Sequence, residues 1–317
     1  MSVLRESNST RLRASLRGVL PAAVTLLVLL AGRAAIQTVF EPAGTALSAA
    51  ETVSIRVLLF ALYVATIGIA LRIATTLDRR RYAEFGLSVD AAWLGNFAAG
   101  TVISAAGIAL SLWWGVARGH RAVDLSSAAS GVDEPLLVAV ALLAFALYFL
   151  LGNVYEEVVY RGIMLQNFAE GLSARGRSPA WAVVPATAGS LLLFGAYHVP
   201  LRGNVVVGVD AAMVGVTFAL AYLLTGDLGL PLGVHFGRMS LELLSGFEML
   251  GVELTAALTI ARNTLPANLE VRLLELGCVC LLVVAWAYLT EGHVGVAKDV
   301  YEPTRGDVDA RGDAADD

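Results

Sequence analysis

The chain has 317 residues, of which 57% are hydrophobic and 15% charged, and its mean hydropathy is +0.71. Soluble domains are about 45–50% apolar, so this composition excludes an ordinary soluble enzyme and indicates a protein with several membrane spans. The net charge of −5 comes without a basic patch, which excludes nucleic acid as a partner. The polar connections are too short to fold alone, so we expect one integral membrane domain.

The two ends of the chain are polar. Residues 1–17 hold four arginines and precede the apolar run 18–40, which is longer than the apolar core of a cleaved signal peptide. We therefore expect a cytoplasmic N-terminal segment at 1–17 and a retained signal anchor. Residues 296–317 are rich in Asp and predict an acidic, disordered tail, which leaves 18–295 for the transmembrane domain.

Apolar windows of about 20 residues, the length that a helix needs to cross the hydrocarbon core, recur along the chain. They predict an all-α fold, a polytopic membrane helix bundle with about eight transmembrane helices. Polar residues interrupt the windows around 198–235, where the boundaries are hardest to place. The expected spans are 18–40, 53–77, 91–116, 136–158, 180–201, 205–225, 229–250 and 267–290.

Arginine is concentrated in alternate connections between these windows. The N-terminal segment, residues 78–90 and residues 162–179 contain arginine, whereas 41–52 is acidic. Basic connections stay on the cytoplasmic side, so both termini are predicted to be cytoplasmic and the protein to lie in the cell membrane. The connection 117–135 fits less well, because it places two arginines on the outer side.

A cluster of charges follows directly on the apolar run 135–155, at Glu156, Glu157 and Arg161. An ionised side chain in hydrocarbon costs about 2.5–3.5 kcal/mol on insertion scales, so these groups must face protein or trapped water. Glu157 and Arg161 are four residues apart and predict an ion pair. Glu156 lies about 100° around the helix, and once desolvated it would have the proton affinity that a general base needs. Alternatively, the three side chains form a buried structural clamp.

Two histidines, His198 and His235, also lie in or at the edge of apolar runs. A single buried histidine is usually a satisfied core residue. Two of them and a carboxylate pair on a third helix favour a shared polar site, because each group needs a polar partner in hydrocarbon. Arg238 lies on nearly the same helical face as His235, and either pairs with Glu242 or points into the same cavity.

A glutamate and two histidines support three kinds of chemistry. They satisfy the ligand count of a zinc hydrolase, although the chain has no His-Glu-x-x-His segment. A metal-free hydrolase could use Glu156 to deprotonate water, with the imidazoles orienting the water and stabilising the oxyanion. A transporter could use the same groups as a proton relay. The leading interpretation is the metal-free hydrolase, for which no metal and no cofactor are predicted.

Three short motifs occur in order inside the apolar runs, at Glu156-Glu157-x-x-x-Arg161, Phe194-x-x-x-His198 and His235. Their order resembles the motifs of the CAAX prenyl protease and bacteriocin-processing intramembrane peptidases, the CPBP or Abi family, over about residues 135–250. The resemblance implies a glutamate-dependent, metal-independent endopeptidase in membrane lipid. Its cavity would be walled by Phe194 and open towards the cytosol. Its substrates would be peptides or lipidated proteins, such as a prenylated CAAX-type C-terminus or a small peptide precursor.

The resemblance also implies a role for each matched residue. Glu156 would be the base that activates water, and Glu157 and Arg161 would support it. His198 would help to hold the water, and His235 would bind the oxyanion. These roles are carried over by position in the motifs.

The third motif departs from the family pattern. The family usually has Asn or Asp four residues after its histidine, but this chain has Met239, whose thioether cannot donate a hydrogen bond. Losing one oxyanion donor can lower the rate by about 10²–10³. Either Arg238, Ser240 or a backbone group substitutes, or the protein is a slow or inactive member. An inactive member would be a membrane scaffold or transporter that keeps the polar cluster for structure or proton movement.

The depth of the three candidate side chains poses a second difficulty. Span counting places His198 near the outer end of its helix, whereas Glu156 and His235 fall nearer the inner side. If the three meet, we expect a broken or re-entrant segment at residues 197–204, which Pro200 and Gly203 would favour.

Overall fold

The computed structural model describes residues 11–40, 47–125, 134–175 and 178–302. Within these ranges, seven helices are long and apolar enough to cross a membrane, so the chain is an integral membrane protein. The prediction of an all-α polytopic membrane bundle is confirmed. The seven spans are provided by α1 (Ala14–Phe40), α2 (Ala49–Asp78), α3 (Ala91–Ala117), α5 (Pro135–Glu157) with its continuation, α7 (Pro179–Arg202), α8 (Val205–Thr225) and α11 (Leu265–Glu291).

The one other expected span, 229–250, is broken. It forms α9 (Gly229–Gly237), α10 (Met239–Leu244) and the strand β2 (Phe247–Met249). Every residue of α9 except Phe236 is buried. An apolar window does not distinguish residues that face lipid from residues that face other helices, and here the window is apolar because protein surrounds it.

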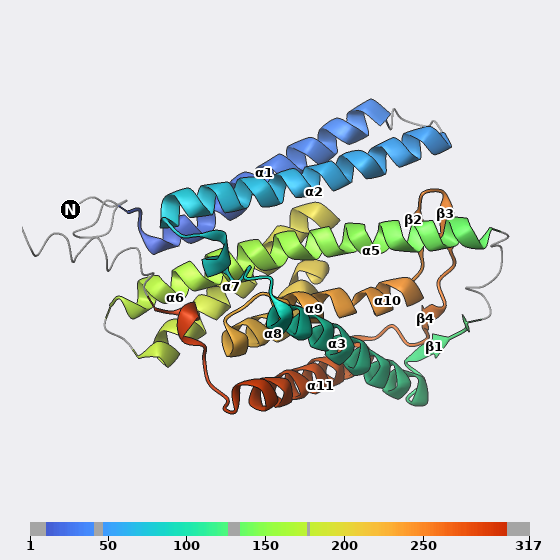
Figure 1. The fold of residues 1–317 in the computed structure, drawn as a ribbon. Coiled ribbons are helices and arrows are strands. Elements are labelled where there is room, and N and C mark those ends of the chain that lie inside the picture. The colour runs from blue at the N-terminus through green and yellow to red at the C-terminus, as the bar shows by residue number, and fades with distance from the viewer. Residues whose placement is uncertain (1–10, 41–46, 126–133, 176–177, 303–317) are drawn as a thin grey trace, which may run out of the picture.

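The long helices run along the length of the molecule (Figure 1). α1 and α2 pack against each other along one side, α5 runs through the middle, and α3 and α11 cross on the other side. Two small antiparallel ribbons lie at the end where α3 stops and α5 begins. They pair β2 with β3 (Val252–Leu254), and β1 (Arg121–Val123) with β4 (Leu258–Ile260).

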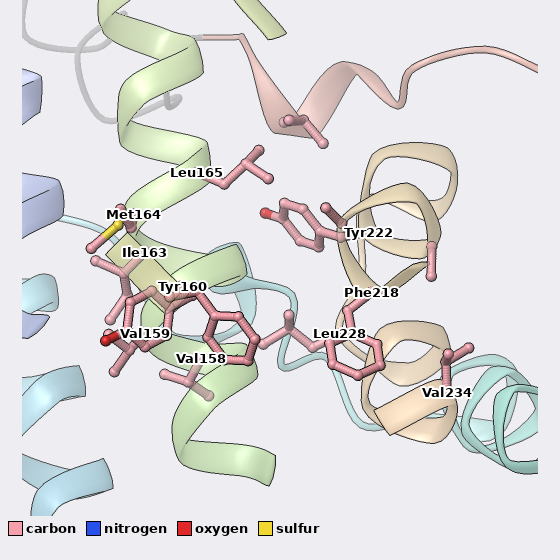
Figure 2. Packing of buried hydrophobic residues seen from close by; sticks show 14 of the residues in the cluster. Val158, Val159, Tyr160, Ile163, Met164, Leu165, Phe218, Tyr222, Leu228 and Val234 are labelled. Carbon is pink, nitrogen blue, oxygen red and sulfur yellow. The ribbon is translucent and has the colours of Figure 1, made fainter. Parts of the chain in front are cut away.

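α5 continues without a break through η2 (Val158–Leu165), which is wound as a π-helix, into α6 (Gln166–Ser173). All eight residues of η2 are buried. Figure 2 shows Leu165 extending from this helix towards Tyr222 of α8, with Leu228 beside Phe218. A Cβ added at Gly162 would lie 2.6 Å from the carbonyl oxygen of Phe85, the last residue of η1 (Tyr82–Phe85). The segment that follows the two glutamates is therefore held in the core on several sides.

α9 packs against α3 through direct backbone contact. A Cβ added at Gly233 would lie 2.1 Å from the Phe97 carbonyl oxygen, and one at Gly237 would lie 2.4 Å from the Thr101 carbonyl oxygen. Small residues allow helices to approach this closely. Since His235 lies between the two glycines, the contact sets its position.

Gly233→Ala is expected to cause a clear decrease in the melting temperature of the protein in detergent. The added methyl group overlaps the Phe97 carbonyl oxygen, so α3 and α9 must separate, and overpacking of this kind costs about 1–3 kcal/mol. Gly277→Ala on α11 is the control, because no described atom lies within 4 Å of a Cβ there. Equal melting temperatures for the two variants would contradict the close contact.

The predicted terminal segments are described only in part. Residues 296–302 contain η3 (Lys298–Val300) and pack on the bundle, where Ala297 N–H donates to the Leu223 carbonyl oxygen at 2.8 Å. The rest of the predicted tail, 303–317, and residues 1–10 lie outside the described residues.

Candidate active site

Glu156 and Glu157 are the last two residues of α5, and they lie in different surroundings. The Glu156 side chain is 13% exposed, whereas that of Glu157 is 1% exposed. Consecutive residues of a helix point about 100° apart, so the two carboxylates can serve different purposes.

Glu157 is held by two cationic or hydrogen-bonding partners. Its Oε1 lies 3.3 Å from Nη1 of Arg161, which is the ion pair that the spacing predicts. The same oxygen lies 2.7 Å from Nδ1 of His235, a contact that the sequence did not predict. Glu157 therefore links the end of α5 directly to α9.

Arg161 is fully buried, and contacts on several sides fix its guanidinium group. Nη2 donates to the Gly215 carbonyl oxygen of α8 at 3.2 Å. The guanidinium carbon lies 4.3 Å from the centre of the Phe194 ring and 5.2 Å from that of Phe218. These cation–π contacts and the carboxylate partly replace the hydration that a buried guanidinium loses.

His198 presents its Nε2 atom to Glu156. Its Nδ1 lies 2.9 Å from the carbonyl oxygen of Phe194, one turn earlier in α7. A carbonyl oxygen only accepts hydrogen bonds, so Nδ1 carries the hydrogen. Nε2 is then an acceptor in the neutral ring, and it lies 3.8 Å from Glu156 Oε1. Phe194 thus orients the imidazole with its backbone, and its ring packs edge-to-face on His198.

His235 has the same arrangement with different partners. Its Nδ1 faces Glu157, and its Nε2 lies 3.7 Å from Glu156 Oε2. The imidazole stacks on Phe218 with 4.2 Å between ring centroids. A carboxylate on Nδ1 fixes the orientation of a histidine ring.

The three side chains predicted to be catalytic meet in the structure, although they come from α5, α7 and α9. Glu156 lies 3.8 Å from His198 and 3.7 Å from His235, which is too long for a direct hydrogen bond but within reach of one bridging water molecule.

The break expected at residues 197–204 is not present, because α7 continues to Arg202 and turns at Gly203 into α8. The broken segment is α9–α10 instead. The turn at Gly203 follows His198 closely, and the break after α9 follows His235 closely. Both histidines therefore lie near a helix end, at the depth of Glu156.

Arg238 is predicted to support the site, but the structure places it elsewhere. Its guanidinium group pairs with Glu275 of α11, and among the described residues it pairs with neither Glu242 nor Glu156. Ser240 Oγ donates to the Gly237 carbonyl oxygen at 2.9 Å. The two side chains considered as substitutes for the donor that Met239 lacks are therefore engaged in other contacts.

Sequence reasoning missed the contribution of α8 and one residue of α5. Phe218 and Gly215 contact His235 and Arg161, yet an apolar residue in an apolar run gives no signal of this kind. Asn153 is different, because an amide inside the run 135–155 is itself a signal. It is 4% exposed and lies one turn before Glu157.

The comparison with known families matches residues 138–238 to one described as type II CAAX prenyl endopeptidase Rce1-like. The match begins in α5 and ends just after α9, so it contains all three side chains that meet. No curated protein and no solved structure matches the chain.

Proposed function

We propose, from the match of residues 138–238 to the CAAX prenyl endopeptidase family model, that the protein is an intramembrane endopeptidase in which Glu156 activates water. The family supports a membrane protease in general. The single observation that carries the finer assignment is the convergence of two imidazole Nε2 atoms on the Glu156 carboxylate, at 3.8 and 3.7 Å.

The reaction begins with a water molecule bound between Glu156 and His198. Glu156 takes a proton from the water while His198 Nε2 accepts the other hydrogen in a hydrogen bond, which aims the oxygen lone pair at the scissile carbonyl carbon. The new C–O bond forms as the carbonyl oxygen becomes an oxyanion. The C–N bond then breaks, and protonated Glu156 returns its proton to the leaving amine.

His235 supports this charge movement on the other side of Glu156. The two carboxylates and Arg161 leave one negative charge, which one additional proton on His235 would balance, and Glu157 Oε1 lies 2.7 Å from its Nδ1. Cationic His235 then donates from Nε2 to the oxyanion. Glu157 and Arg161 act through His235, as positioning residues.

The substrate class follows from the family and the membrane setting. A prenylated CAAX-type C-terminus would place its lipid between the helices while the peptide reaches Glu156, and a small peptide precursor is the other candidate. The arginine distribution supports cytoplasmic termini in the cell membrane, and the resemblance to the family implies a cavity that opens towards the cytosol.

A catalytically silent scaffold or transporter is the second candidate. The observation that favours it is Met239, which provides no hydrogen-bond donor where the family usually has one. In that case the Glu and His groups would serve structure or proton movement.

A cleavage assay in detergent with a chelator separates these possibilities. The purified protein is incubated with a prenylated CAAX peptide and with a pool of unmodified peptides, and products are identified by mass spectrometry. We expect cleavage that persists in the chelator and is lost in Glu156→Ala.

Two results would count against this mechanism. Two imidazoles and a carboxylate are also a donor set for zinc, so loss of cleavage on chelation would overturn the metal-free mechanism. If the wild-type protein cleaves no peptide, and proton flux into liposomes depends on Glu156, the transporter is supported.

A further inference from the structure

Asn153 is a buried amide in the middle of an apolar helix. Its side chain is 4% exposed, and Nδ2 has no hydrogen-bond partner among the described residues. Burying an amide without a partner costs free energy, so each such group in a folded protein requires an explanation.

The position of Asn153 is fixed by its neighbours on α5. Phe149 and Glu157, four residues before and after it, lie on the same helical face, and both contact His235. Asn153 is therefore bracketed by two side chains that reach the same imidazole, and it lies three residues from Glu156.

α5 and the α9–β2 segment run antiparallel. Along α5, Glu157 contacts His235, Phe149 contacts Phe236, and Phe145 stacks on Phe247. Position 239 lies one helical turn after His235, and Asn153 lies one turn before Glu157. Because the two segments run in opposite directions, one turn forward from His235 and one turn back from Glu157 lead towards the same end of the pair. Asn153 therefore lies at about the same height along the pair as Met239, on the facing helix.

Few donors remain for a second hydrogen bond to an oxyanion. Neutral His198 presents an acceptor at Nε2, Arg238 pairs with Glu275, and Ser240 donates to a backbone carbonyl. The Tyr197 hydroxyl is also buried without a described partner, but its ring packs on Tyr155 and Tyr160, and Tyr155 lies about 160° around α5 from Asn153.

We propose that Asn153 is a catalytic residue whose Nδ2–H donates to the oxyanion, beside Nε2 of His235. The inference rests on the proposed endopeptidase function. The amide stays neutral throughout: as water adds, the carbonyl π electrons move to the oxygen, Glu156 holds the proton, and Asn153 stabilises the new negative charge without giving up a proton. From α5, Asn153 supplies the hydrogen-bond donor that the thioether of Met239 cannot provide.

The alternative is that Asn153 supports Glu157. Glu157 Oε2 is buried without a described partner, and it lies four residues from Asn153 on the same face. A side-chain rotation would then let the amide hold the carboxylate, and Asn153 would be a positioning residue.

Asn153→Leu distinguishes the two roles, because leucine keeps the volume and removes both amide atoms. We expect kcat for the peptide of the cleavage assay to fall by about 10²–10³ with KM little changed, and the melting temperature to stay equal or rise. Adding Met239→Asn to Asn153→Leu returns a donor from the opposite helix, and we expect at least about a tenfold recovery of kcat.

Tyr197→Phe is the matched variant, since it removes another buried donor that has no partner among the described residues, and it is expected to retain activity. The inference is overturned if Asn153→Leu keeps the wild-type kcat. It is also overturned if Asn153→Leu lowers the melting temperature and the double variant with Met239→Asn recovers no kcat. Loss of activity in Tyr197→Phe alone also overturns it. If the wild-type protein cleaves and Glu156→Ala does not, the proposed function stands whatever Asn153→Leu does; if neither cleaves, both fail.

Discussion

Glu156→Gln is expected to lower kcat for peptide cleavage by about 10²–10⁴ while the melting temperature stays close to that of the wild type. Glutamine keeps the shape of the side chain but cannot take a proton from water. The nearest imidazole nitrogens are 3.7 and 3.8 Å from the Glu156 carboxylate, so the exchange removes no direct hydrogen bond to a described residue.

Glu157→Gln is the matched comparison, because it makes the same change one residue later. Glu157 holds His235 at 2.7 Å and Arg161 at 3.3 Å, and removing its charge leaves a buried guanidinium without a counter-ion. We expect a clearly lower melting temperature together with reduced cleavage. The two variants are compared by thermal unfolding in detergent and by the cleavage assay. Collapse of the fold in Glu156→Gln would instead favour a structural clamp made of both glutamates.

Arg161→Met is expected to be the most destabilising change in the site, by about 3–5 kcal/mol. The guanidinium is completely buried and contacts Glu157, the Gly215 carbonyl oxygen and two aromatic rings. Without it, Glu157 is an ionised carboxylate in the protein interior with only His235 to balance it. Thermal unfolding in detergent and the yield of monodisperse protein measure the loss.

Arg118→Met provides the control for this change. Arg118 also pairs with a glutamate, Glu270, at 3.2 Å, but the two side chains are 54% and 34% exposed. Exposed ion pairs contribute little to stability, so we expect almost no effect. The double variant Arg161→Met/Glu157→Gln removes both buried charges and should regain part of the lost stability, although not activity. Equal stability of Arg161→Met and Arg118→Met would show that the Glu157 pair is not desolvated.

The long helices and the Glu157–Arg161 pair could be predicted because their signals are local. A run of apolar residues of sufficient length forms a span, and a four-residue spacing places two side chains on one helical face. The candidate site residues Glu156, His198 and His235 could be named because polar groups inside apolar runs are rare.

Other features depend on contacts between distant segments and leave no local signal. The stacking of Phe218 on His235 is one example, and the pairing of Arg238 with Glu275 is another. The break after α9 was missed because its residues are as apolar as those of a lipid-facing helix. Asn153 could have been noticed, since it is an amide in an apolar run, but its neighbours on α9 were not available from the sequence.

The broken segment between α8 and α11 has a consequence for how the chain crosses the bilayer. The described ranges contain seven spanning helices, and an odd number would by itself leave the start of α1 and the end of α11 on opposite sides of the membrane. Yet both ends meet α6: Arg17 of α1 pairs with Glu170 at 3.3 Å, and Gln166 Nε2 donates to the Asp299 carbonyl oxygen at 2.9 Å. Residues 229–264 lead back along the bundle, and the α9 part of this segment is buried by the surrounding helices. This segment depends on its neighbours for insertion, and the part that carries His235 can reach its place only after the surrounding helices have assembled.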